Sequence, residues 1–255
     1  MNAAPRIHFL VGGVQKAGTS ALARYLRAHP RIALPRDKEA HVFDAPDFDE
    51  SWAVADINAR HASLFDDGGG GALHGDATPV YILHPRFIER IARYNPAMRW
   101  IVLLRDPAER ALSHYHMERA RGDEKWPLWP ALLLERWRLR GHAANFSHDS
   151  PLRHHSYRLR GDYARQLDAL YARFPRGQVL LLSNRELRDD PTGTVRKACA
   201  FLGIEPLPWE LEPETVFAGD YAPPRHNAIG MRLLRWLMRR ELRDMRERHG
   251  IRFDD

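Results

Sequence analysis

The segment that decides the fold is Phe9–Leu22, which reads FLVGGVQKAGTSAL. An apolar run of strand type, Ile7–Val11, leads directly into a glycine-rich turn, Gly12–Gly18. Apolar residues then recur at helical spacing over Thr19–His29, and Pro30 ends the pattern. The segment therefore predicts a strand, a P-loop-like phosphate loop and a helix in direct succession.

The rest of the chain repeats this alternation of strands and helices. Strands are expected at Arg31–Leu34, after the glycine-rich loop Asp66–Gly71, at Trp100–Leu104 and at Val179–Leu182. Helices are expected from Pro107, over Asp162–Phe174, around Val195–Leu202, and over a C-terminal segment of about 228–250. Such alternation predicts an α/β fold, with a mostly parallel β-sheet flanked by helices, as a single domain over residues 1–255.

Composition narrows the class of protein. The 255 residues are 44% hydrophobic and 28% charged, which is typical of a globular chain. Cys199 is the one cysteine, which excludes a disulfide framework and favours a reducing, cytoplasmic setting. No apolar stretch approaches the ~18 residues of a membrane span, and Met1–Arg6 lacks a secretory leader, so neither a membrane span nor secretion is expected.

The positive charge is concentrated in one part of the sequence, and arginine greatly outnumbers lysine. The formal net charge is +6, and residues 225–255 hold nine arginines and five acidic residues in a helical pattern. Such a run is usually a solvated helix face, although a basic protein that binds nucleic acid or another anion remains an alternative. Only four of the 39 cationic residues are lysines, and two of them, Lys16 and Lys38, fall in motifs.

The loop Gly13–Ser20 has the glycine spacing of a nucleotide-binding loop but not its lysine. In a Walker A loop the lysine follows the second glycine, whereas here Thr19 follows Gly18 and the lysine is the earlier Lys16. A kinase or NTPase is therefore disfavoured. Backbone N–H groups at a helix N-terminus, two hydroxyls and one ammonium still suit an anion. The alternative is that Gly18 and Thr19 only turn and cap the helix.

Phe9–Leu22 resembles the 5′-phosphosulfate loop of sulfotransferases that use 3′-phosphoadenosine 5′-phosphosulfate (PAPS), in the bacterial and heparan-sulfate-sulfotransferase-like branch. The resemblance implies that the loop binds the donor co-substrate, and that Lys16 stabilises the leaving group without a metal. The donor-binding residues so implied are Lys16, Ala17, Gly18, Thr19 and Ser20.

A second anion site is implied after the strand at Trp100–Leu104. By the same resemblance, Arg105 and Ser113 match the residues that bind the donor's 3′-phosphate, and Arg225 matches a later clamp on the donor. A guanidinium fork and a hydroxyl suit a phosphate monoester. Taken alone, the Arg105–Pro107 stretch is more typical of a helix cap with an ion pair, and the phosphate site is favoured only because the first loop occurs with it.

The stretch Lys38–Asp44, KEAHVFD, resembles the catalytic stretch of the family. Glu39 matches the general base, with His41 as the rival, because an acceptor must lose a proton as it attacks sulfur. The resemblance implies that Lys38, His41, Asp44 and Tyr81 bind the acceptor. Without the phosphate loops, the same stretch would be taken as a charged loop.

These features predict a PAPS-dependent sulfotransferase, of EC 2.8.2 type. The acceptor is expected to be a hydroxyl, or less favourably an amine, of a saccharide or other small metabolite, and no nucleic-acid partner is expected. A homodimer is compatible with the sequence. No metal is expected, because the pairs His114 with His116 and His154 with His155 lack helical two-ligand spacing. A P-loop-type ATP-dependent kinase and the basic anion-binding protein are the alternatives.

Overall fold

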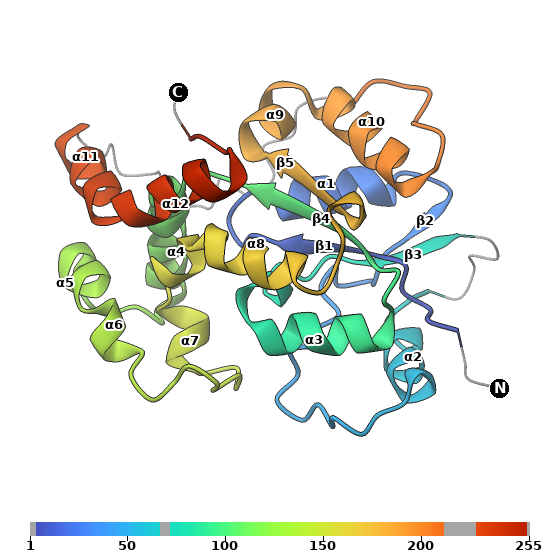
Figure 1. The fold of residues 1–255 in the computed structure, drawn as a ribbon, viewed down its shortest axis with the longest axis horizontal. Coiled ribbons are helices and arrows are strands. Elements are labelled where there is room, and N and C mark those ends of the chain that lie inside the picture. Colours follow the sequence, from blue (N-terminus) through green and yellow to red (C-terminus); the bar gives the residue numbers. More distant parts are fainter. Residues whose placement is uncertain (1–3, 67–71, 212–227, 254–255) are drawn as a thin grey trace. The chain divides into compact units, whose positions relative to one another are not determined.

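The computed structural model describes residues 4–66, 72–211 and 228–253 (Figure 1). Within it the chain forms two compact units. Unit 1 comprises Met1–Leu104 and Asp168–Val216, and unit 2 comprises Arg105–Leu167 and Phe217–Asp255. Unit 1 is therefore made from two separate stretches of sequence.

Unit 1 is built on a parallel sheet. Among the described residues the sheet has five strands in the order β2-β3-β1-β4-β5, and every paired strand is parallel to its neighbour. The strands are β1 (Phe9–Gly13), β2 (Ile32–Ala33), β3 (Leu73–Asp76), β4 (Arg99–Leu104) and β5 (Val179–Ser183). The prediction of an α/β fold with a mostly parallel sheet is confirmed.

Helices cover both faces of this sheet. Helices α1 and α10 lie on one face and α3 lies on the other (Figure 1). The helices of unit 1 are α1 (Thr19–Arg27), α2 (Val54–Ala62), α3 (Pro85–Tyr94), α9 (Asn184–Asp189) and α10 (Pro191–Leu202), with 3-10 turns η1 (Tyr81–Leu83) and η3 (Arg176–Gln178). The predicted helices at 19–29 and near 195–202 are confirmed with small changes of boundary, whereas the sequence analysis did not predict α3.

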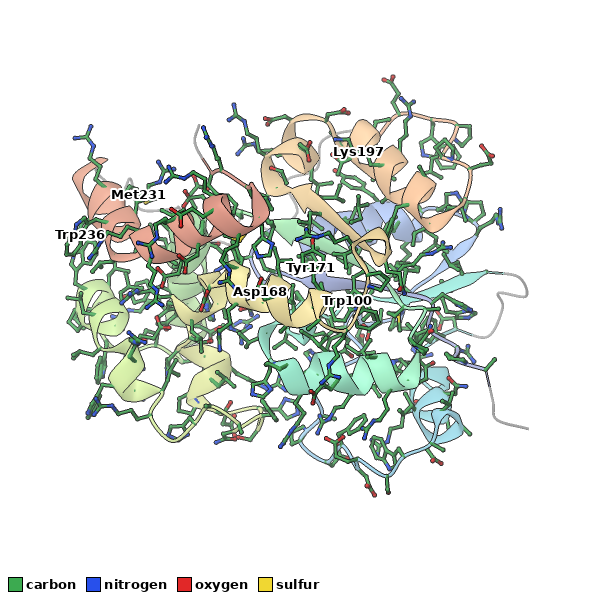
Figure 2. All side chains as sticks on the ribbon, viewed as in Figure 1. Trp100, Asp168, Tyr171, Lys197, Met231 and Trp236 are labelled. Atoms are coloured by element: carbon green, nitrogen blue, oxygen red, sulfur yellow. The ribbon has the colours of Figure 1, made fainter. Side chains whose placement is uncertain are left out.

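The core of unit 1 is packed around the central strands. Trp100 of β4, labelled in Figure 2, has no exposed surface. Its ring centroid lies 5.7 Å from that of Phe174. A Cβ atom on Gly12 would collide with the Trp100 ring. Glycine is therefore required at Gly12 by close packing rather than by turn geometry.

Unit 2 is helical. Its helices are α4 (Pro107–Arg121), α5 (Leu128–Leu133), α6 (Glu135–Arg138), α7 (Pro151–His154), α11 (Ala228–Leu237) and α12 (Arg239–His249), with the 3-10 turn η2 (Leu159–Gly161). Helix α8 (Tyr163–Tyr171) crosses the boundary between the units. The predicted C-terminal helical segment is present as two helices, which Met238 separates.

The start of α4 follows from its sequence. The Asp106 carboxylate accepts hydrogen bonds from the N–H groups of Ala108 at 2.8 Å and Glu109 at 2.9 Å, and Pro107 occupies the first helical turn. The expected cap at the Arg105–Pro107 stretch is therefore present.

Helix length also bears on membrane insertion. Over residues 4–66, 72–211 and 228–253, every helix falls short of the length and apolar content that a bilayer crossing requires.

Candidate functional site

The candidate site lies at the carboxyl edge of the sheet in unit 1. The strands β2, β3 and β1 are neighbours and parallel, so the segments that follow them emerge at one edge. The loop Gly13–Gly18, here called the anion loop, follows β1. The Lys38–Asp44 loop lies beyond β2, and Ala77–Val80 follows β3. Ligands in open parallel sheets bind at this edge, so the sheet order brings the predicted motifs of unit 1 together.

The anion loop, residues Gly13–Gly18, is held by backbone and side-chain hydrogen bonds. The Val14 N–H donates to Leu103 O at 2.9 Å, and the Ala17 N–H donates to Val14 O at 3.2 Å. The Asn184 amide Nδ2 donates to Ala17 O at 2.9 Å. The loop is thereby fixed to β4 and to the start of α9.

Gly18 ends the loop in a left-handed conformation, with φ of 96°. This conformation favours glycine, and a Cβ here would also approach Asn184 Nδ2 to 3.0 Å. The first N–H groups of α1 have no intrahelical acceptor, and Gly18 offers no side-chain cap to them. Such a helix N-terminus suits an anion, and the donor-binding role of Thr19 and Ser20 stays a prediction.

The Lys38–Asp44 loop is held in place by three buried side chains, those of Asp76, Thr78 and Tyr81. Asp76 is the last residue of β3 and Thr78 follows it, and Thr78 Oγ1 donates to Asp76 Oδ1 at 2.6 Å. The Ala40 N–H donates to both Asp76 Oδ1 at 3.1 Å and Thr78 Oγ1 at 3.0 Å. The Tyr81 hydroxyl donates to Asp76 Oδ2 at 2.7 Å and accepts from the Val42 N–H at 3.1 Å. This network sets the path of the loop and thus the positions of its charged groups.

Four charged side chains of this loop form one connected array. Lys38 Nζ lies 2.6 Å from Glu39 Oε1 and 3.5 Å from Thr19 Oγ1 at the start of α1. Glu39 Oε2 lies 3.2 Å from His41 Nε2. His41 Nδ1 lies 2.9 Å from Asp44 Oδ2. The predicted residues Lys38, Glu39, His41 and Asp44 are therefore in contact, and Lys38 links them to the anion loop.

The array shifts two pKa values in opposite directions. Burial disfavours the charged form of Glu39, but the hydrogen bond from His41 and the Lys38 ammonium lower the pKa of Glu39 to about 2. Burial likewise disfavours the imidazolium form of His41, but hydrogen bonds to Asp44 and Glu39 raise the pKa of His41 to about 10. At neutral pH, Glu39 is a carboxylate and His41 is an imidazolium.

Two of the predicted acceptor-binding residues have no exposed surface. Tyr81 is fully buried, and its hydroxyl is used by Asp76 and Val42. Asp44 is also fully buried and bonds the half-buried His41. Both side chains therefore support the loop from within, and their predicted contact with the acceptor stays a prediction.

The predicted 3′-phosphate residues belong to unit 2. Arg105 precedes α4, and its Nε lies 3.1 Å from Glu109 Oε2, one turn into that helix. Its backbone carbonyl accepts a hydrogen bond from the Tyr163 hydroxyl at 3.1 Å. Ser113 lies a further turn along α4 and is half-buried. Arg225 lies outside the described residues.

The sequence analysis missed the contribution of Asn184. The signal available was its position, because Asn184 directly follows β5 (Val179–Ser183) at the same edge of the sheet. A polar side chain at the carboxyl end of a parallel strand is a candidate site residue. The contact with Ala17 joins residues that are 167 positions apart, which no local pattern shows.

Comparison with known proteins gives consistent matches. The family described as "Sulfotransferase domain" matches residues 6–215. Heparan sulfate glucosamine 3-O-sulfotransferase 3B1 of Mus musculus is 30% identical over 196 residues, which cover 77% of this chain and 46% of that protein. Bifunctional heparan sulfate N-deacetylase/N-sulfotransferase 2 of Homo sapiens is 30% identical over 214 residues, which cover 78% of this chain and 22% of that protein. The chain thus spans less than half the length of these two relatives.

A solved structure matches over nearly the whole chain. It is the sulfotransferase from Alicyclobacillus acidocaldarius, with 29% sequence identity and a TM-score of 0.74. The alignment covers 96% of this chain and 95% of that one. The arrangement of helices and strands is therefore similar along the full length of a known structure.

Proposed function

Because this chain belongs to the sulfotransferase family, we propose that it transfers a sulfuryl group from PAPS to a hydroxyl of a saccharide or other small metabolite. An amine is the less favoured acceptor. In this reaction the acceptor oxygen bonds to sulfur, the bond from sulfur to the bridging phosphate oxygen breaks, and 3′-phosphoadenosine 5′-phosphate leaves. We propose a cytoplasmic setting for the reaction.

One observation carries this proposal: the contact between the charged array and Thr19, the first residue of α1, directly after the anion loop. Lys38 Nζ is 3.5 Å from Thr19 Oγ1 and 2.6 Å from Glu39 Oε1. Sulfuryl transfer requires an anion-binding site on one side of the sulfuryl group and a proton acceptor for the attacking group on the other side. A single lysine touches both in this structure.

Glu39 fits the general base better than His41 does. With a pKa raised to about 10, His41 is protonated at neutral pH and has no lone pair for the proton of an acceptor. Glu39 is ionised and retains 31% of its side-chain surface, whereas Asp44 is fully buried. We propose that Glu39 accepts the proton that the acceptor loses. His41, which Asp44 holds in place, positions the Glu39 carboxylate.

Lys38 would also tune the basicity of Glu39. Its ammonium is one cause of the lowered pKa of Glu39, a value that makes the carboxylate a weak base. A sulfonate bound near Thr19 would attract Lys38 away from Glu39. Glu39 would then become more basic at the stage when the proton must be accepted.

The loop residues supply charge and hydrogen-bond donors for the donor's 5′ end. Lys16 has a left-handed backbone, with φ of 71°, within the turn that precedes α1. We propose that its ammonium stabilises the negative charge on the bridging oxygen as the S–O bond breaks. Ala17, Gly18, Thr19 and Ser20 hold the phosphosulfate through N–H and hydroxyl groups, while Arg105 and Ser113, with Arg225, bind the 3′-phosphate.

Calorimetric titration tests the donor assignment. The wild-type chain is titrated with 3′-phosphoadenosine 5′-phosphate, with adenosine 5′-phosphosulfate and with ATP plus Mg²⁺. Tight binding that requires the 3′-phosphate and weakens in Arg105→Ala is expected. Preference for ATP with Mg²⁺ would favour a P-loop kinase, and absence of nucleotide binding would overturn both enzyme assignments.

A further inference from the structure

A cluster of side chains that could ligate a metal ion lies in unit 2, and it shares no residue with the proposed transfer reaction. Glu118 near the end of α4, Asp123 just beyond α4 and His154 at the end of α7 each offer one ligand atom, and these atoms lie within 4.8 Å of one another. The spacing of neighbouring histidines along the sequence does not predict such a cluster. The residues that meet here are instead 31 positions apart, from Asp123 to His154.

The end of α4 fixes the two carboxylates relative to each other. Gly122 has a left-handed backbone, with φ of 86°, and reverses the chain after Arg121. The N–H groups of Asp123 and Glu124 both donate to Glu118 O, at 3.0 Å and 3.1 Å. The backbone turn therefore brings the side chain of Asp123 next to that of Glu118.

His154 presents one particular nitrogen to these carboxylates. Its Nε2 lies 2.8 Å from His148 O, and a carbonyl only accepts, so Nε2 carries a proton. Its Nδ1 lies 2.7 Å from Glu118 Oε2 and 3.6 Å from Asp123 Oδ2. Without a metal, Nδ1 carries a proton and donates it to Glu118 Oε2, and a bound cation would take the place of that proton. An imidazole whose second N–H is held by a backbone carbonyl is also the usual arrangement of a metal-ligating histidine.

We propose that Glu118, Asp123 and His154 bind a divalent transition-metal cation, with Zn²⁺ the best match. One imidazole and two carboxylates form a mixed N/O set that Zn²⁺ accepts, and a water would complete four-coordination. Ca²⁺ and Mg²⁺ prefer all-oxygen sites, so an imidazole ligand selects against them.

The surroundings support the ligands. Glu118 has 2% of its side-chain surface exposed, and its other oxygen, Oε1, lies 3.5 Å from Nε2 of the buried His114, one turn earlier on α4. Ligating carboxylates are commonly held by such neighbours. Arg121 also approaches Oε1, at 3.7 Å, but its side chain is 59% exposed and is able to turn into solvent. Oε2 and the Asp123 side of the cluster then remain available to a cation.

Metal titration of the tag-free, full-length chain tests the proposal. After chelation and dialysis, calorimetry with Zn²⁺ is expected to show one equivalent bound, and Co²⁺ is expected to give the visible absorption of a tetrahedral site. Ca²⁺ and Mg²⁺ are expected to bind at least tenfold more weakly. His154→Ala and Asp123→Asn should each weaken Zn²⁺ binding by about tenfold or more.

The control is His142→Ala, which removes a histidine of unit 2 that lies outside the cluster. It should bind Zn²⁺ as the wild type does. The thermal unfolding of each variant without metal separates loss of a ligand from loss of the fold. Asp123→Asn is the variant that should disturb the fold least, because 44% of the Asp123 side-chain surface is exposed. Equal Zn²⁺ affinity in wild type and both ligand variants, or no binding by the wild type, would overturn the proposal, and neither result bears on sulfuryl transfer.

Discussion

His41 Nδ1 lies 2.9 Å from Oδ2 of Asp44, a carboxylate with no exposed surface. A buried carboxylate of this kind must be compensated by a donor, and here the donor is a side chain of the candidate active site. The contact therefore links the stability of unit 1 to the charge state of its site.

Asp44→Asn should lower the free energy of unfolding by about 2 kcal/mol, because it replaces a charged acceptor of a buried hydrogen bond with an amide. Urea unfolding measures the change. Asp47→Asn is the matched control, since Asp47 is 69% exposed and pairs with Arg60 at 3.3 Å. That variant should lose less than about 1 kcal/mol. Equal losses in the two variants would show that the buried contact with His41 contributes little.

The stability of the chain should depend on pH through His41. The folded pKa of His41, about 10, lies above its ordinary value of 6.5, so its contribution is fully present below pH 6.5 and is lost as pH rises toward 10. In His41→Gln this loss should disappear, so the unfolding free energies of the two proteins should converge as pH rises. Urea unfolding from pH 6 to pH 10 measures the convergence. A constant gap over this range would contradict the raised pKa.

Glu39→Gln should lower kcat by about 10² to 10⁴, the usual contribution of a general base, while the affinity for 3′-phosphoadenosine 5′-phosphate is retained. Acceptor-dependent release of that product measures kcat, and calorimetry measures the affinity. Asp37→Asn is the control, because Asp37 is an exposed carboxylate two residues away. Retention of wild-type turnover by Glu39→Gln would remove Glu39 from the mechanism.

Tyr81→Phe should destabilise the chain by about 1 to 2 kcal/mol and also lower activity. The substitution removes the hydroxyl that joins Asp76 Oδ2 to the Val42 N–H, and both partners are buried. Thermal and urea unfolding measure the first effect. Tyr171→Phe, at a half-buried position, should change stability by about 0.5 kcal/mol or less. If Tyr81→Phe lost activity with unchanged stability, Tyr81 would instead contact the acceptor.

The sequence was sufficient for elements that depend on local pattern. The apolar run Trp100–Leu104 forms β4, and Pro107 starts α4 after the Asp106 cap, because buried strands and caps leave short-range signatures. The Lys38–Asp44 array was also predictable as a group, since its members lie within seven residues.

Features that depend on distant contacts were not predictable. Burial of Tyr81 follows from packing against Phe43, whose ring centroid lies 5.5 Å away, and no spacing rule distinguishes such a tyrosine from one that faces a ligand. The protonated state of His41 likewise depends on the orientation of two carboxylates. The meeting of Asp123 with His154 depends on a turn and a separate helix.

The hydrogen bond from Asn184 to Ala17 O has a consequence for how the chain folds during synthesis. The loop that follows β1 is synthesised first, and the partner that fixes it is made 167 residues later. Residues 105–167, which belong to unit 2, are synthesised in between. Closing contacts of such large sequence separation slows folding, and the nascent β4 edge stays open until β5 arrives. The anion loop therefore gains this anchor only after Asn184 has been synthesised, although its own sequence is complete long before.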